Sequence, residues 1–200
     1  MTVTQRIKET CYKYPERPAL QVKDSNGVFQ PYLYKTFYKD VSADGAALAS
    51  GLVSRGDHIG LISDNRKEWI ITDLAIMGIG AADVPRGSDS TEAELVHILS
   101  HSEAKMVFME TFRKAAMLLE DKDQLPQLES LVIFNPITDE EYETLTSYEV
   151  KVYRFDDLMK KGREILASDP EAFEKELAKG QLSDLATIIY NPVPPEFLKV

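Results

Sequence analysis

The sequence is short of the residues that several classes of protein need. Cys11 is the only cysteine among 200 residues, which excludes an internal disulfide framework and agrees with a reducing compartment. No apolar run approaches the length of a membrane span, and no cationic segment followed by an apolar run opens the chain. We therefore expect a cytoplasmic protein with no transmembrane segment, whose membrane contact would be peripheral.

Basic residues are outnumbered by acidic ones. The chain has 23 lysines and arginines against 33 aspartates and glutamates, a net charge of −10, and its basic residues are scattered. A nucleic-acid footprint needs clustered lysine and arginine, so this class of partner is excluded. The remaining composition, 44% hydrophobic and 28% charged, is typical of a soluble globular domain.

The apolar pattern predicts an α/β fold with a doubly wound, mostly parallel sheet flanked by helices. A helix over 3–14 precedes a hairpin of strands 19–23 and 28–34. Thr36 is the expected N-cap of a helix over 37–54 that Gly56 ends. Further strands are expected at 58–63, 80–85, 105–109, 130–134, 149–153 and 185–190, and further helices at 66–77, 91–100, 112–120, 155–167 and 170–178. Thr91 and Glu94 have the spacing of a capping box, and 138–144 is expected to be an acidic loop.

No group of residues forms a convincing catalytic, cofactor-binding or metal site. Gly78 and Gly80 form a Gly-x-Gly, but between a helix and a strand, the reverse of a dinucleotide loop, so a helix C-terminus is favoured. His97 and His101 lie four residues apart without a third ligand, which favours surface histidines over a metal pair. Cys11 has no activating neighbour.

Two charged segments have alternative interpretations. The acidic run 139–143 could bind a metal, but a solvated loop is the default. The helical stretch 155–178 could lie on a membrane surface, and a core-facing helix with a charged outer face is favoured.

Several segments in order resemble the acyl-CoA synthetases of the adenylate-forming enzyme superfamily. The matching segments are 14–20, 53–69, 76–85, 94–108 and 185–190. The segment 85–91 is most similar to the long-chain fatty acid branch. The resemblance covers nearly all of 5–190 and implies the first part of the large N-terminal domain of a long-chain fatty acid–CoA ligase, incomplete as it stands.

This resemblance implies a reaction and its cofactors. Such ligases join a fatty acid to ATP, giving an acyl-adenylate, and then pass the acyl group to coenzyme A, with Mg²⁺ as the metal. Their phosphates are held by a glycine-rich loop, Tyr-Thr-Ser-Gly-Thr-Thr-Gly-x-Pro-Lys-Gly, that follows a strand like 185–190. That loop and the later catalytic motifs do not occur in this sequence.

The last residues match the same loop in a shifted reading frame. One coding of Tyr-Thr-Ser-Gly-Thr-Thr-Gly-Val-Pro-Lys-Gly-Val-Met, after loss of a single base from its first threonine codon, reads Tyr-Asn-Pro-Val-Pro-Pro-Glu-Phe-Leu-Lys-Val and then a stop. That string is residues 190–200. We therefore expect 1–190 to be a partial AMP-binding domain and 191–200 an out-of-frame tail, the product of a frameshift.

The expected consequence is a chain that is inactive alone and has no catalytic, cofactor-binding or metal residues of its own. An unfinished sheet would leave an edge and an apolar face uncovered. The alternative is a non-catalytic interaction module that associates with a partner or with the downstream remainder of the synthetase.

Overall fold

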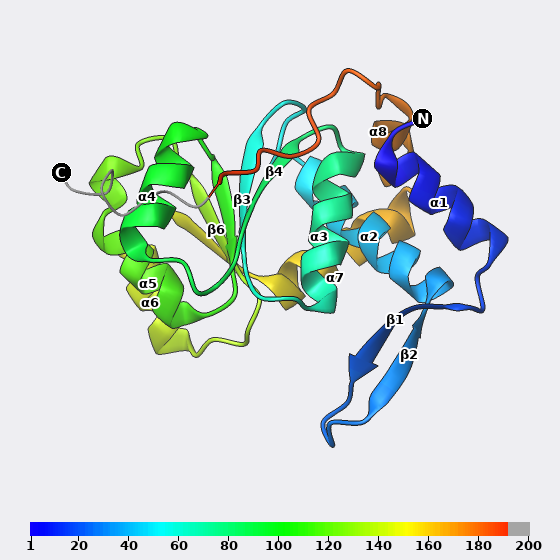
Figure 1. Ribbon diagram of the computed structural model, residues 1–200, viewed down its shortest axis with the longest axis horizontal. Helices are drawn as coiled ribbons and strands as arrows, with labels where there is room; N and C mark the ends of the chain where they lie inside the picture. The colour runs from blue at the N-terminus through cyan, green and yellow to red at the C-terminus, as the bar shows by residue number, and fades with distance from the viewer. Residues whose placement is uncertain (192–200) are drawn as a thin grey trace. The chain divides into compact units, whose positions relative to one another are not determined.

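A computed structural model describes residues 1–191 of the chain, which form two compact units (Figure 1). Unit 1 contains Met1–Gly56, Asn65–Ala81 and Leu158–Leu185. Unit 2 contains Asp57–Asp64 and Ala82–Asp157, together with the segment that begins at Ala186. Each unit is therefore assembled from separate stretches of the chain.

A five-stranded parallel sheet organises unit 2. Its order is β4-β3-β5-β6-β7, and every neighbouring pair is parallel. The strands are β3 (His58–Ile62), β4 (Ala82–Arg86), β5 (Met106–Met109), β6 (Ser130–Ile133) and β7 (Lys151–Arg154). Every residue of β5 and of β6 is buried, as expected for strands covered on both faces. The predicted α/β fold with a mostly parallel sheet is confirmed.

Three helices cover one face of this sheet (Figure 1). They are α4 (Glu92–His101), α5 (Phe112–Glu120) and α6 (Asp139–Thr146), and the 3₁₀ turn η1 (Lys122–Gln124) follows α5. Leu99 of α4, Leu118 of α5 and Leu145 of α6 pack in one buried cluster with Val107 and Leu131 of the strands. Burial of such side chains is worth roughly 1.5–3 kcal/mol each, so this cluster is the main core of unit 2.

Unit 1 is a helical assembly with a hairpin. Its elements are α1 (Val3–Lys13), β1 (Pro18–Lys23), β2 (Phe29–Leu33), α2 (Tyr34–Ala49), α3 (Lys67–Gly78), α7 (Phe155–Ser168, from Leu158 onward) and α8 (Ala172–Ala178). Glycines allow close packing: a Cβ on Gly162 would lie 1.8 Å from the Ala43 carbonyl oxygen, and one on Gly45 would lie 2.3 Å from the Phe173 ring. The tight approach of α7 and α8 to α2 therefore requires these glycines.

The predicted boundaries of the second helix are wrong. Helix α2 begins at Tyr34, with Leu33 at the N-cap and no side-chain capping bond, so Thr36 lies inside the helix. It ends at Ala49, where Gly51 (φ 102°) continues the chain in a conformation that favours glycine. Gly56, with φ 83°, belongs to the following turn and does not end the helix. The amides of Tyr34 and Lys35 donate instead to the carbonyl oxygens of Arg17 and Pro15, so backbone contacts from another segment replace a side-chain cap at this helix start.

The predicted acidic loop is also wrong, because 139–146 form helix α6. Thr138 is its N-cap: the Thr138 hydroxyl accepts a hydrogen bond from Glu141 N at 3.2 Å, and Thr138 N donates to Glu141 Oε2 at 2.8 Å. Asp139, Glu140 and Glu141 lie in the first turn, where the helix dipole favours negative charge. The acidic residues thus stabilise a helix start.

The predicted closing strand 185–190 is present only as an isolated bridge. Thr187 pairs with Asp83 in the parallel direction, next to β4. Asp83 N donates to Ala186 O at 3.2 Å, and Ile188 N donates to Asp83 O at 2.8 Å. The segment therefore adds to the β4 edge of the sheet, as its apolar pattern indicated, but over a shorter length than expected.

Candidate functional site

The strand order creates a switch point at the carboxyl edge of the sheet. From β3 the chain goes to β4 on one side, and it then returns to β5 on the other side of β3. Ligands of open α/β sheets commonly bind outside the carboxyl ends of the strands at such a point. The candidate site in unit 2 therefore lies at the residues that follow β3 and β5, which are Ser63, Asp64 and Glu110.

These three residues bind one another. Glu110 Oε2 accepts hydrogen bonds from Ser63 Oγ at 3.1 Å and from Asp64 N at 2.8 Å. The Asp64 carboxylate in turn accepts from the backbone N–H of Ser88 at 3.3 Å and from the Ser88 hydroxyl. The switch point is thus closed by a network whose ionisable members are both carboxylates.

This arrangement suits neither phosphate nor a metal. A phosphate cradle needs free N–H donors, but the Asp64 and Ser88 amides already donate to carboxylates, whose charge would repel a phosphate. Within residues 1–191 no group of three histidine, cysteine, aspartate or glutamate side chains is close enough to hold a metal ion. The Asp64 and Ser88 amides at this switch point are therefore already occupied as hydrogen-bond donors.

The segment beside β4 holds a buried carboxyl. The side chain of Asp83, only 1% exposed, faces Thr187 in the parallel bridge. Burial raises the pKa of Asp83 to about 6, and the hydrogen bond with Thr187 works in the opposite direction. The Asp83–Thr187 pair therefore fixes the point at which the segment joins the sheet.

Tyr190, at the end of that segment, contacts helix α4. Its hydroxyl lies 2.7 Å from His101 Nδ1, and the two rings meet edge to face with centroids 5.6 Å apart. In the resemblance described above, the residues after this tyrosine form the phosphate loop. The predicted out-of-frame tail spans 191–200, and all of it after Asn191 lies outside the described residues.

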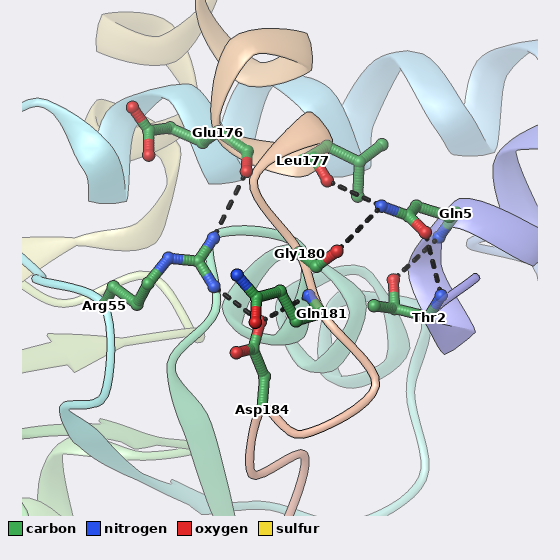
Figure 2. A network of polar contacts seen from close by, with 8 residues as sticks. All are labelled: Thr2, Gln5, Arg55, Glu176, Leu177, Gly180, Gln181 and Asp184. Atoms are coloured by element: carbon green, nitrogen blue, oxygen red, sulfur yellow. Dashed lines mark hydrogen bonds and ion pairs between the residues drawn. The ribbon is translucent and has the colours of Figure 1, made fainter.

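In unit 1, a network of polar contacts holds residues 176–184, which precede the segment beside β4 in the chain (Figure 2). Gln5 Nε2 donates to the carbonyl oxygens of Leu177 at 2.9 Å and Gly180 at 3.4 Å. Gln5 Oε1 accepts a hydrogen bond from Thr2 N at 2.9 Å, so the capping box of α1 also orients the Gln5 side chain. The N-terminus of α1 thereby anchors the end of α8.

Arg55 holds the same segment from the other side (Figure 2). Its guanidinium donates to Asp184 Oδ2 at 2.6 Å and to Glu176 O at 3.3 Å. Asp184 Oδ2 also accepts from Gln181 N at 2.9 Å, and these two donors lower the pKa of Asp184, the backbone bond first. A Cβ on Gly80 would lie 2.1 Å from Arg55 Nη1, so the guanidinium lies directly over this glycine.

Several sequence predictions for candidate residues are confirmed. Helix α3 ends at Gly78 and Gly80 has φ 79°, which is a helix C-terminus and no dinucleotide loop. His97 and His101 are both exposed on α4. Cys11 is buried, and burial raises the pKa of its thiol to about 11.

The charged stretch 155–178 also folds as expected. Leu158, Phe173 and Leu177 are buried, so α7 and α8 face a core. Each helix found among residues 1–191 is too short or too polar to cross a bilayer.

Sequence reasoning missed the Ser63–Asp64–Glu110 network and the Arg55–Asp184 pair. The signal for the first was available, because polar residues directly follow the apolar strands β3 and β5. The Arg55–Asp184 pair left no signal in the sequence, because the two residues are far apart in the chain and charged residues are frequent throughout it.

Comparisons with known proteins agree with this architecture. The family described as AMP-binding enzyme matches residues 7–191. Long-chain-fatty-acid–CoA ligase FadD15 of Mycobacterium tuberculosis is 30% identical over 149 residues, 72% of this chain and 22% of that protein. Long chain acyl-CoA synthetase 4 of Arabidopsis thaliana is 27% identical over 187 residues, 90% of this chain and 26% of that protein. The chain thus spans about a quarter of the length of these relatives.

Solved structures show the same fold. The A domain of a carboxylic acid reductase from Segniliparus rugosus, in complex with AMP and a co-purified carboxylic acid, matches with a TM-score of 0.67. It is 20% identical and covers 82% of this chain and 30% of its own. Coronafacic Acid Ligase from Pectobacterium brasiliense matches with a TM-score of 0.68 at 15% identity, over 80% of this chain and 29% of its own. The family match extends from helix α1 to the segment beside β4, and on that ground this chain belongs to the AMP-binding enzyme family.

Proposed function

We propose that the chain is the first part of a long-chain fatty acid–CoA ligase. The observation that carries this proposal is the similarity to proteins named as long-chain ligases, which extends over most of the chain. In the intact protein the substrates would be a long-chain fatty acid, ATP and coenzyme A, with Mg²⁺ as the metal. We place that protein in the cytoplasm, with at most a peripheral contact to membranes.

We further propose that a protein of these 200 residues does not catalyse the reaction. The sequence contains no glycine after Gly180, and Pro192, Pro194 and Pro195 lack the backbone N–H that a phosphate cradle uses. Loss of a single electrostatic donor costs roughly 10²–10³ in rate, so loss of the whole loop would remove measurable turnover. The acidic switch point supplies no substitute donor.

An assay of ATP-dependent acyl-CoA formation tests this directly. With palmitate, ATP, Mg²⁺ and coenzyme A, the purified chain is expected to give no product above a blank without protein. The matched control is a gene with one base restored in the Tyr190–Asn191 codons and the downstream sequence included, which is expected to turn over. Product formation by the 200-residue chain would show the proposal of inactivity to be wrong.

The frameshift itself is part of the proposal. The family match ends at Asn191, and one possible coding of the phosphate loop yields residues 190–200 after loss of a single base. Sequencing the gene through these codons and several hundred bases beyond tests it. Ligase sequence continuing in another frame would support a frameshift, whereas its absence from every frame would contradict it.

An interaction module is the second candidate function. Leu182, Leu185 and Ile189 are 81%, 54% and 74% exposed, and a downstream part of the ligase would cover such apolar side chains. Co-expression with the separately translated remainder tests this role. Co-purification that is lost in an Ile189→Asp variant would support association, and separate elution of the two parts would contradict it.

A further inference from the structure

A cavity of about 380 Å³ lies in unit 1, and all of its lining residues belong to that unit. Residues at the end of α1, along α2 and at the α7–α8 junction line it. They are Cys11, Tyr12, Pro15, Lys35, Tyr38, Lys39, Ser42, Leu166, Pro170, Phe173 and Glu174. Neither the sequence resemblance nor the proposed function assigns a role to it.

The lining of this cavity is largely apolar, and three of its residues are aromatic: Tyr12, Tyr38 and Phe173. Tyr38 and Phe173 are buried, with ring centroids 6.4 Å apart. Tyr12 meets Tyr38 edge to face at 5.7 Å, yet Tyr12 is 67% exposed. Aromatic rings prefer such offset and edge-to-face partners, so the open side of Tyr12 offers a surface on which another flat ring can pack.

The polar groups within the cavity are already engaged. Glu174 accepts from the Tyr38 hydroxyl at 2.8 Å and pairs with Lys8 through its other oxygen. Ser42 Oγ donates to Tyr38 O at 2.8 Å. These contacts engage the Tyr38 and Ser42 hydroxyls and pair the Glu174 carboxylate with a lysine.

The two lysines of the lining differ. Lys35 Nζ is paired with Glu16 at 2.8 Å, whereas Lys39 is exposed and has no ion pair among residues 1–191. The lining therefore combines an aromatic interior with one uncompensated positive charge. A ligand that matches both features has a flat apolar body and a single anionic group.

We propose that this cavity is a binding site for small aromatic organic anions, such as aromatic carboxylates. The ring lies against Tyr12 and the Tyr38–Phe173 wall, and the carboxylate pairs with Lys39. The apolar body supplies most of the affinity, because the lysine is exposed and an exposed ion pair contributes little. The site is independent of ATP and of the proposed ligase reaction.

The test uses the full 200-residue chain and two probes of nearly equal shape. Binding of 1-naphthoate and of its neutral counterpart 1-naphthamide is measured by isothermal titration calorimetry. The chain is expected to bind one molecule of 1-naphthoate, and 1-naphthamide about two- to fivefold more weakly, the effect of one exposed ion pair. Lys39→Gln is expected to lower the affinity for 1-naphthoate to that for 1-naphthamide, without changing the latter.

Two further variants complete the design. Lys160→Gln, which removes an exposed charge of α7 outside the lining, serves as the matched control and should leave both affinities unchanged. Ser42→Leu fills the cavity and should abolish binding of both probes, with the circular dichroism spectrum as the check that the variant is folded.

Absence of saturable binding, equal affinity for the two probes, or an equal loss in Lys39→Gln and Lys160→Gln would overturn the proposal.

Discussion

Asp44 and Asp83 are carboxyls that the fold removes from water. Both are almost completely buried, and in each the Oδ1 atom has no hydrogen-bond partner among the described residues. Burial raises the pKa of Asp44 to about 7, against the effect of the Thr72 hydroxyl, which donates to its Oδ2 at 2.7 Å. An ionised form of either group would still have one carboxylate oxygen without a donor, so these residues make the stability of the chain depend on pH.

The first prediction concerns Asp44→Asn. A folded pKa above the unfolded value of 3.8 means that the folded state binds the extra proton, so stability falls as pH rises from about 4 to 7. This decrease is at most about 1.4 kcal/mol for each pH unit of that window. Asp44→Asn, which is uncharged at every pH, should therefore be more stable than the natural chain at pH 8 and gain nothing at pH 4. Urea unfolding at the two pH values measures this difference.

Asp123→Asn is the matched control, because Asp123 is an exposed carboxyl of η1. Its stability difference from the natural chain should not change between pH 4 and pH 8. If Asp44→Asn showed the same flat difference, the buried carboxyl would not be the source of the pH dependence.

The second prediction concerns Gly80, over which Arg55 lies. An alanine there would adopt φ 79°, and its Cβ would displace the guanidinium that binds Asp184. Gly51→Ala is the matched control, since Gly51 has φ 102° and open space around it. The control should lose about 1–2 kcal/mol of unfolding free energy to backbone strain alone. Gly80→Ala should lose more, and equal losses in urea unfolding would show that the Arg55 contact contributes nothing.

At the scale of elements, three helices begin with the same device. Capping boxes at Thr2 and Gln5, at Thr91 and Glu94, and at Thr138 and Glu141 start α1, α4 and α6. In each, the side chains of the two residues satisfy backbone N–H groups that the first turn leaves without partners. The box at α4 was predicted from its spacing, and the one at α6 was overlooked because its acidic first turn resembled a solvated loop.

The third prediction is that α6 depends on its N-cap. Thr138→Ala removes the hydroxyl that accepts from Glu141 N and should cost about 1 kcal/mol of unfolding free energy. Thr144→Ala is the control, because Thr144 lies within the same helix and alanine has the higher helix propensity. Thermal unfolding compares the two, and a Thr144→Ala variant as destabilised as Thr138→Ala would contradict the capping role.

At the scale of the whole molecule, neither unit is a continuous piece of chain. The backbone passes between the units after Gly56, Asp64, Ala81, Asp157 and Leu185. Unit 1 needs residues from both ends of the sequence, as the contact of Gln5 with Leu177 shows. We therefore expect that neither unit can be produced alone by a simple truncation.

The fourth prediction follows from that connectivity. Trp69, the only tryptophan, reports on unit 1, and amide exchange of β5 reports on unit 2. Because the same backbone builds both units, the two probes should give one unfolding free energy in urea. Two separate midpoints would show that the units unfold independently.

At the carboxyl edge of the sheet, the sequence predicted the strands but not the contacts between the residues that follow them. Apolar runs identified β3 and β5, and hence the place where their ends meet. They did not reveal that Glu110 closes this edge by binding Ser63 and Asp64 N. Hydrogen bonds between residues far apart in sequence leave no local pattern, whereas burial of a strand does.

The sequence by itself determined the α/β class, the strands and most of the helices, because apolar periodicity and capping residues act over a few positions. The ordered segments that resemble acyl-CoA synthetases also came from it. Only the tertiary structure decided where α2 begins and how much of 185–190 joins β4. It alone formed the aromatic cavity beside Lys39 and brought Arg55 to Asp184, since these depend on packing between distant parts of the chain.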